Sequence, residues 1–336
     1  MPARLFTTRT TTPSRSFRCG FTGAIVPARA GLVPQLLEDS HYHRGVDFGI
    51  CLPNFPDGAS PEGIEAAAEV AEGLGWSAAW TTDHVLVPQD SAAEYGRIYE
   101  AILTLAWVGA RHPSLRLATS VIVVPQRNAV VLAKELASLD SLSGGRVIAG
   151  VGVGWNRTEF GNLGMGDRFH VRGAYLDETI RLWRHLWSGS SEPFHGRFHQ
   201  IDDFAFGPLP QQGAGLPIVV GGRAERALRR AGEIGDGYHA SVSSPAQYGE
   251  RVPVVRAAAE AAGRPMPWLS ARARVEFEAA STTSYAMRGS PEAIAAEIHA
   301  FAGVGVTHLA LWFGTTDPTE LFARAERFGR EVMPLV

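Results

Sequence analysis

The sequence contains only two cysteines among its 336 residues, Cys19 and Cys51. Two cysteines this far apart form neither a disulfide framework nor a zinc-binding pattern, which is typical of a protein kept in a reducing cytosol. The chain also lacks any apolar run approaching 18 residues, so the sequence predicts no membrane-spanning helix. We therefore expect a cytoplasmic protein with no membrane partner.

An excess of either charge is absent as well. The formal net charge is −3, from 31 Lys and Arg residues against 34 Asp and Glu residues. Because no long basic stripe is present, the sequence argues against binding to nucleic acid. Hydrophobic residues make up 45% of the chain and charged residues 19%, which suits a globular protein with one large domain or two small ones.

The first 45 residues differ from the rest of the chain. They are rich in Thr, Ser and Arg, and the first acidic residue is Glu38. They have neither the helical periodicity of a transit peptide nor the apolar core of a signal peptide. We expect a disordered, dispensable extension at residues 1–45 and a folded domain at 46–336. The alternative is a start site placed too early, since VDFGICLPNF would make an ordinary N-terminus at Val46.

From Val46 onward, short apolar runs alternate with amphipathic stretches. Strands are predicted at residues 46–52, 77–82, 115–123, 146–153, 217–222, 236–241, 269–277 and 307–313. Helices are predicted at 61–74, 98–112, 127–142, 172–187, 224–233, 245–262, 290–303 and 318–331, several with a Ser-Pro start signal. Eight strand–helix pairs over about 290 residues predict a (β/α)8 TIM barrel. A doubly wound open sheet shows the same alternation and remains the alternative.

One segment interrupts this alternation. Residues 191–215 contain four phenylalanines, with Gly196 between two short runs. The pattern predicts a β-hairpin insertion near 191–210, followed by a loop rich in Pro and Gly.

Histidines with metal-ligand spacing lie in unsuitable places. His41 and His43 form an H-x-H pair, but within the N-terminal extension. His195 and His199 are four residues apart, but in the predicted hairpin rather than on a helix. The sequence therefore predicts no metal centre, and it contains no P-loop, nucleophile-elbow or kinase motif.

Three glycines at alternate positions, Gly150, Gly152 and Gly154, end the fourth predicted strand. Their spacing does not match a dinucleotide fingerprint, which needs G-x-G-x-x-G. In a barrel, the carboxyl ends of the strands form the floor of the active site. The glycines either let a flat ring lie close to the backbone or relieve crowding inside the barrel, and the spacing alone leaves both interpretations open.

Two further predicted strand ends carry residues that could bind or react with a ligand. Asp83 and His84 follow the second predicted strand, and a histidine beside a carboxylate can exchange a proton near neutral pH. The alternative is an aspartate that caps the next segment beside an ordinary polar histidine. Gly221 and Gly222 lie between a strand and a helix, where backbone N–H groups favour an anion, and a plain turn is the alternative.

The segment LATSVIVVPQRNAVVLAKELASLDSLSGGRVIAGVGVGWNRTEF, residues 117–160, resembles the central signature of the bacterial luciferase-like monooxygenase superfamily. More narrowly, it resembles the branch of deazaflavin F420-dependent oxidoreductases. The similarity continues through residues 181–239 and 288–313, and so covers essentially 46–331. It implies a luciferase-like barrel that transfers a hydride between coenzyme F420 and a small organic substrate.

The resemblance also implies roles for individual residues. His84 and Asp83 would face the deazaflavin ring, with His84 assisting a proton. A non-proline cis peptide would join Ser120 to Val121 and support the back of the ring. The implied cofactor-binding residues are Asp83, His84, Ser120, Val121, Gly152, Gly154, Trp155, Gly221 and Gly222, the last two against the phosphate-bearing tail, where Arg223 could add charge.

Trp155 departs from the pattern of the F420-dependent sugar-phosphate dehydrogenases, in which an acidic residue follows the last glycine. The departure argues against glucose-6-phosphate and for a flatter or more apolar substrate. Glu159 falls a turn later and is not assigned the acid role. The walls of the substrate pocket are expected from residues 86–97 and from Asn54, Phe55, Trp155 and Phe160.

Two other functions remain open within the same fold. The first is a two-component monooxygenase that activates O2 with FMNH2 and needs a flavin reductase as partner. The second is a barrel that only carries a flavin. Relatives are commonly dimers, so a homodimer is a further expectation, and the substrate itself is a small molecule of unknown identity.

Overall fold

Eight parallel strands pair side by side until the last one meets the first. The computed structural model describes residues 45–277 and 284–336, so Cys19, His41, His43 and nearly all of the predicted extension lie outside it. The strands follow the order β1 (Asp47–Cys51), β2 (Ala78–Thr81), β3 (Arg116–Thr119), β5 (Val147–Gly152), β8 (Ile218–Gly221), β9 (Gly237–Ser241), β10 (Trp268–Glu276) and β12 (His308–Trp312). Because β12 pairs with β1 from Asp47 opposite His308 onward, the sheet closes. The TIM-barrel prediction is confirmed, and the open doubly wound alternative is wrong.

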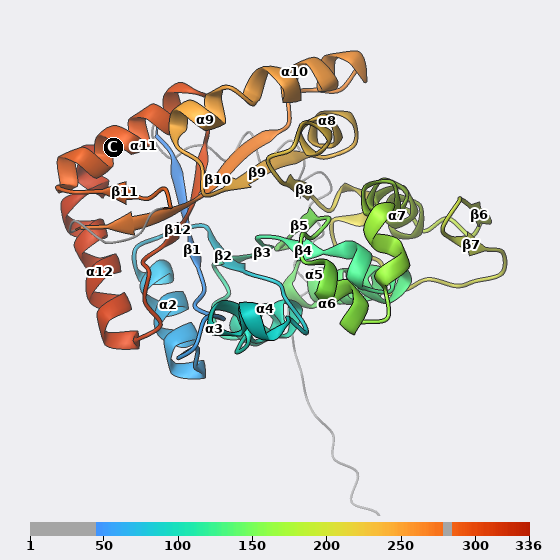
Figure 1. Ribbon diagram of the computed structural model, residues 1–336, viewed down its shortest axis with the longest axis horizontal. Coiled ribbons are helices and arrows are strands. Elements are labelled where there is room, and N and C mark those ends of the chain that lie inside the picture. The colour runs from blue at the N-terminus through green and yellow to red at the C-terminus, as the bar shows by residue number, and fades with distance from the viewer. Residues whose placement is uncertain (1–44, 278–283) are drawn as a thin grey trace, which may run out of the picture. The chain divides into compact units, whose positions relative to one another are not determined.

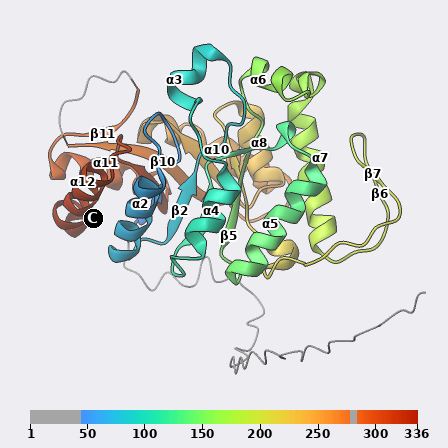
Figure 2. The same cartoon turned by 90° about the horizontal axis from the view of Figure 1, so that it is seen from below.

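Helices follow the barrel strands and lie outside them (Figures 1 and 2). The main helices are α2 (Pro61–Gly73), α4 (Ala101–Gly109), α5 (Ala129–Ser143), α7 (Arg172–Trp187), α8 (Glu225–Glu233), α10 (Val252–Ala261), α11 (Pro291–Gly303) and α12 (Pro318–Glu331). Ser60 and Ser290 start α2 and α11 as expected, because each hydroxyl accepts a backbone N–H three residues on and a proline follows.

Two predicted elements are divided in the structure. The third predicted strand breaks into β3 and β4 (Ile122–Val123) at the Ser120–Val121 peptide bond, which is cis as the resemblance implies. The predicted helix 245–262 is two helices, α9 (Pro245–Gly249) and α10, the second with a proline in its first turn. Short elements also fill predicted loops: the 3-10 turns η1 (Gln89–Ser91), η2 (Val124–Gln126), η3 (Gly166–His170), η4 (Gly213–Gly215) and η5 (Met333–Leu335), the helices α3 (Ala92–Tyr95) and α6 (Arg157–Asn162), and the strand β11 (Met287–Arg288).

The predicted hairpin is present as β6 (Phe194–His195) and β7 (Gln200–Ile201), which pair antiparallel. It stands out from the barrel beyond α7 in both views (Figures 1 and 2). The carboxylate of Glu178 on α7 anchors it by accepting the N–H groups of Arg197, Phe198 and His199 at 2.7, 2.7 and 2.9 Å.

The inside of the barrel is packed around the indole of Trp80. Trp80 is 1% exposed and is surrounded by a cluster that includes three inward-facing alanines. Its indole stacks on the imidazole of His239, with ring centres 4.5 Å apart and planes 6° apart. The barrel is therefore a packed core, and in such barrels the chemistry takes place at the end where the strands finish.

The glycine ladder is explained by crowding within the protein. A Cβ at Gly150 would lie 1.7 Å from the carbonyl oxygen of Thr119. At Gly152 it would lie 2.6 Å from a methyl group of Val121, and at Gly154 2.5 Å from one of Val123. Gly154 also has a φ of +71°, which favours glycine. Of the two interpretations left open by the spacing, the structure supports relief of crowding, because Thr119, Val121 and Val123 occupy the space in question.

Gly150→Ala should therefore be severely destabilising. The new methyl group would overlap backbone, which cannot rotate away, so we expect a loss of about 3 kcal/mol or more in the free energy of unfolding. Gly161→Ala on α6 is the matched control, because no atom lies within 4 Å of its Cβ position and alanine favours a helix. Urea denaturation measures both, and equal stability of the two variants would contradict the crowding explanation.

Two buried histidines predict an acid-sensitive fold. Burial lowers the pKa of His239 to about 3 and that of His308 to about 4, from an ordinary 6.5. Below about pH 6.5 the unfolded chain therefore binds two protons that the folded chain does not, so stability present at neutral pH is lost as the pH falls. Between about pH 7.5 and 5 the two histidines should lower the free energy of unfolding by about 4 kcal/mol.

Urea denaturation at both pH values measures this loss. His308→Asn should remove about half of the pH dependence, because one of the two titrating groups is then missing. His199, whose pKa burial also lowers, acts in the same direction. Stability that is flat over this range would show that the interior histidines take up protons in the folded state.

Candidate functional site

The candidate site lies where the barrel strands finish. His84 follows β2, the Ser120–Val121 bond follows β3, and Glu159 lies on α6, just after β5. Carboxyl ends of parallel barrel strands converge on one face, so residues far apart in sequence meet there.

The imidazole of His84 contacts the carboxylate of Glu159. His84 Nδ1 lies 2.8 Å from Glu159 Oε2, with the side chains 7% and 1% exposed. The other oxygen of Glu159 accepts the backbone N–H groups of Val85 at 2.7 Å and Leu86 at 3.3 Å. The carboxylate thus holds both the ring of His84 and the loop that carries it.

Local structure explains why Glu159 points this way. The Asn156 side chain caps α6 by accepting the N–H groups of Thr158 and Glu159, at 3.1 and 3.2 Å. Glu159 is therefore in the first helical turn, where the helix dipole favours a negative charge. The Asn156-x-x-Glu159 spacing is the sequence signal for this placement, although it says nothing of His84, 75 residues away.

The pKa of Glu159 is lowered from its ordinary value. Burial acts to raise it, but hydrogen bonds from His84 and from the Val85 N–H outweigh that effect. The amide of Gln126 lies near enough to add to the lowering, although its geometry is not that of a hydrogen bond. An ionised Glu159 accepts a hydrogen bond from His84 Nδ1–H, which leaves His84 Nε2 as the nitrogen that can exchange a proton.

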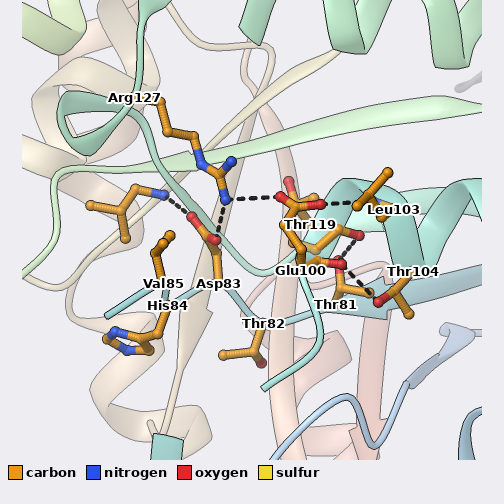
Figure 3. A network of polar contacts seen from close by, with 12 residues as sticks. Thr81, Thr82, Asp83, His84, Val85, Glu100, Leu103, Thr104, Thr119 and Arg127 are labelled. Atoms are coloured by element: carbon orange, nitrogen blue, oxygen red, sulfur yellow. Dashed lines mark hydrogen bonds and ion pairs between the residues drawn. The ribbon is translucent and has the colours of Figure 1, made fainter. Parts of the chain in front are cut away.

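Asp83 has a different partner from the one expected of it. One carboxylate oxygen contacts Arg127 Nη2 at 2.6 Å and the other accepts the Val123 N–H at 2.8 Å. The same Arg127 nitrogen also contacts Glu100 at 2.9 Å. In Figure 3 the ring of His84 points away from the Asp83 carboxylate.

The carboxylate beside His84 is therefore that of Glu159, and the expected pairing with Asp83 is corrected. Adjacent residues of an extended segment project to opposite sides, so Asp83 and His84 cannot easily share a partner. Asp83, fully buried against Arg127, instead joins β4 to the segment that follows β2.

Several aromatic rings lie around His84. Trp155 meets His84 edge-on with ring centres 5.9 Å apart, and the ring of Tyr95 lies 4.2 Å from that of His84. Phe55 stacks on Tyr95 at 5.5 Å and on Trp312 at 5.9 Å. Trp155 is 60% exposed, and the neighbouring Val85 and Leu86 are 47% and 52% exposed, so the surface around His84 is apolar.

Two of the expected pocket residues are structural. Asn54 is fully buried, and its amide donates to the carbonyl oxygens of Thr82 and Tyr99 at 2.8 and 2.9 Å. Phe160 is also fully buried and packs on Phe169, with ring centres 5.3 Å apart. Neither side chain is available to a substrate.

Arg272 is a site residue that the sequence did not reveal. It lies on β10, donates to the Thr82 hydroxyl at 2.9 Å, and has its guanidinium 5.3 Å from the centre of the Phe55 ring. It also acts to lower the pKa of the Cys51 thiol, which burial raises. The run SARARVEF predicts a strand but not which arginine faces inward, since that depends on the register with β9 and β12.

The remaining predicted cofactor residues fall into two groups. Gly152 and Gly221 both lie under Val121, since a Cβ on either would come within 2.8 Å of its methyl groups. Gly222 lies apart from these, in an exposed turn before α8, with a φ of +130°. Helix α8 has no side-chain cap, and Arg223 is exposed beside its first turn. An uncapped helix start with a nearby cation suits an anionic group.

Other possible sites lie elsewhere or are absent. Cavities of about 310 and 500 Å³ lie on the outer helices, the smaller one lined in part by Asp177 and Arg181 of α7. Among residues 45–277 and 284–336, no group of three or more His, Cys, Asp or Glu side chains could hold a metal ion. The same residues include no helix that is both long and apolar enough to cross a membrane.

Removal of Arg127 tests the structural role given to Asp83. Arg127→Met would leave a fully buried carboxylate without its cation, so we expect a loss of about 3–5 kcal/mol in the free energy of unfolding. Arg229→Met is the control, because Arg229 pairs with Glu225 on the surface and such pairs contribute little. Asp83→Asn combined with Arg127→Met should recover part of the loss; a single variant as stable as the control would contradict this role.

Comparison with known proteins shows which family the chain resembles. The family model for luciferase-like monooxygenases matches residues 46–330. The F420-dependent glucose-6-phosphate dehydrogenase of Mycolicibacterium fortuitum is 32% identical over 213 residues, which are 61% of this chain and 61% of that protein. An uncharacterised protein of Mycobacterium tuberculosis is 32% identical over 214 residues, which are 60% of this chain and 73% of that one. The chain thus matches about three fifths of the length of the dehydrogenase.

Solved structures share the fold. An F420-dependent secondary alcohol dehydrogenase, solved with an F420–acetone adduct, superimposes with a TM-score of 0.72 at 18% identity, covering 87% of this chain and 99% of that one. A long-chain alkane monooxygenase gives a TM-score of 0.74 at 12% identity, covering 87% and 92%. At these identities the likeness shows the barrel alone. Since the family model spans nearly the whole described barrel, the chain belongs to the luciferase-like monooxygenase family of enzymes.

Proposed function

We propose that the protein is an F420-dependent oxidoreductase that acts on a small organic substrate. The observation that carries the proposal is the His84–Glu159 contact of 2.8 Å at the strand ends, next to the exposed ring of Trp155. A histidine whose Nδ1–H is held by an ionised carboxylate presents Nε2 for proton transfer. The relatives named as F420-dependent dehydrogenases support the choice of cofactor.

The residues present fit a bound deazaflavin. Both amide atoms of Gln126 are buried near Glu159 and have no hydrogen-bond partner among the described residues, so they are free to meet a polar ligand. The uncapped start of α8 with Arg223 suits the phosphate-bearing tail. When bound, F420 would supply the hydride chemistry, and the protein would supply position, proton transfer and a dry environment.

Each residue of the site then has a defined task. His84 would exchange the proton through Nε2, while Glu159 keeps the imidazole oriented and its other nitrogen protonated. The rings of Tyr95, Trp155 and Phe55 would exclude water from the reacting atoms. Arg272 would offer a positive charge to an oxygen of the substrate, because its guanidinium lies between Thr82 and Phe55.

A cofactor titration tests this proposal. Oxidised F420 is fluorescent, so its binding can be followed directly, with FMN as the competing ligand in a matched titration. We expect saturable F420 binding and much weaker FMN binding. Binding of FMN alone would support the reductase-dependent monooxygenase. Cofactor binding without turnover of any alcohol, ketone or unsaturated carbonyl compound tested would support a carrier. Failure to bind either cofactor would contradict all three functions.

Glu159→Gln tests the assigned roles within the site. Glutamine can still accept the Val85 N–H, but it turns an amide N–H toward His84 and loses the negative charge. We expect F420 affinity to stay within a few-fold of wild type while turnover falls by about 10²–10⁴, as for His84→Ala. The assay uses the best substrate from a panel of alcohols, ketones and unsaturated carbonyl compounds.

Glu69→Gln is the control for this experiment, because Glu69 is an exposed residue on α2. It should leave both affinity and turnover unchanged. Full activity in either site variant would remove the His84–Glu159 pair from the reaction.

A further inference from the structure

The side chain of Arg272 lies inside the mouth of the barrel. Its neighbours on β10, Ala271 and Ala273, are buried in the large core cluster that includes the surrounding helices. Because side chains alternate along a strand, Ser270 and Arg272 face the interior instead. Ser270 does so visibly, since its hydroxyl contacts the buried imidazole of His239 at 3.0 Å. Arg272 is the next inward position, nearer to the carboxyl end of the strand.

Thr82 holds the guanidinium on the side of the chain where His84 lies. Arg272 Nη1 donates to the Thr82 hydroxyl at 2.9 Å. Thr82 is itself fixed by the buried amide of Asn54, which donates to its carbonyl oxygen at 2.8 Å and accepts its N–H at 3.1 Å. In Figure 3 the side chains of Thr82 and His84 both lie on the other side of the chain from the Asp83 carboxylate. The positive charge is therefore on the same side as the His84 imidazole.

No described residue supplies a negative charge to Arg272. The side chain is partly buried, and none of the carboxylates in the described part of the chain lies within ion-pair distance of it. Its remaining neighbours are the ring of Phe55 at 5.3 Å, the thiol of Cys51 and the phenol of Tyr95. Burial raises the pKa of the Cys51 thiol and that of the Tyr95 hydroxyl, so both groups are neutral at pH 7.

Arginines close to Arg272 are compensated within the protein. Arg127 contacts both Asp83 and Glu100. Arg274, two residues further along β10, pairs with Glu276. A guanidinium that is partly removed from water without a counter-ion costs free energy, which an anionic ligand recovers when it binds. The charge of Arg272 is thus left for a ligand.

The chemistry around Arg272 indicates which anion fits. A guanidinium presents its N–H groups as a planar fork that matches the two oxygens of a carboxylate, and only one of these groups is used by Thr82. One positive charge balances one negative charge, whereas a phosphate dianion would need a second cation, and Arg127 and Arg274 are already paired. The stacked rings of Phe55 and Trp312 beside it suit a flat, apolar body.

We propose that Arg272 binds a carboxylate group of the substrate, and that the substrate class is therefore a small, flat carboxylic acid whose reacting carbon lies toward His84. The inference deepens the proposed function and rests on it for the acid being the molecule that exchanges a hydride with the cofactor. The anion site itself does not depend on that function.

Calorimetric titration with matched acids and amides tests the anion site. Benzoate and cinnamate are compared with benzamide and cinnamamide, which have the same shape but no charge. Each is titrated into the protein alone and into the protein saturated with oxidised F420. We expect each carboxylate to bind at least tenfold more tightly than its amide, because a hydrogen bond between two charged groups is stronger than a neutral one. Equal affinity for acid and amide in both titrations would overturn the proposal, whatever the variants do.

Arg272→Met should abolish the preference for the acid. Arg272→Lys keeps the charge but loses the planar fork, so it should retain a reduced preference, and it replaces the first variant if that one fails to fold. Arg229→Met is the matched control, because Arg229 is exposed on α8, and it should behave as wild type. A full preference in Arg272→Met would overturn the proposal. So would a preference lost in Arg223→Met instead, because the anion would then bind at the start of α8.

The outcomes separate this inference from the proposed function. Protein that binds F420 but shows no preference for the acids would overturn the role of Arg272 and leave the proposed function standing. Protein with a preference that depends on Arg272, but with no affinity for F420, would overturn the proposed function and leave the anion site standing.

Discussion

The carboxylate of Glu159 is the interaction on which the candidate site depends. One of its oxygens contacts the His84 imidazole, and the other accepts the Val85 N–H from the loop after β2. Asn162 on α6 also donates to the Leu86 carbonyl oxygen at 3.1 Å, but at an exposed position, whereas His84 and Glu159 are nearly inaccessible. The loop after β2, which carries His84, is therefore positioned by Glu159 on α6, the helix that follows β5.

Below this contact, side chains fill the space between the strands, so that larger residues would not fit there. Val121 occupies the positions that side chains at Gly152 and Gly221 would need, and Arg127 holds Asp83, which joins β4 to the segment after β2. Tight packing and a buried ion pair fix the backbone at the barrel mouth. A rigid floor is a precondition for holding a reacting ring in one orientation, because small displacements are costly to catalysis.

The barrel could be predicted from the sequence because its signals are local. Alternating apolar runs and Ser-Pro starts such as Ser60–Pro61 depend on neighbours within a few residues. The site could be predicted only in part. His84 and Ser120 were found through resemblance, whereas the pairing of His84 with Glu159 joins residues 75 apart and depends on how the strand ends converge. Asp83 was expected beside His84 because the two adjoin in sequence, yet they point to opposite sides. Arg272 was missed because alternation in a strand does not say which face is inside.

The most direct measurement is a crystal structure of the complex with oxidised F420. We predict that the ring lies over the strand ends, against the Ser120–Val121 bond, with His84 Nε2 about 3 Å from a ring or substrate atom. A ring bound in the cavity beside Asp177 and Arg181, or one that leaves His84 and Ser120 out of contact, would contradict it.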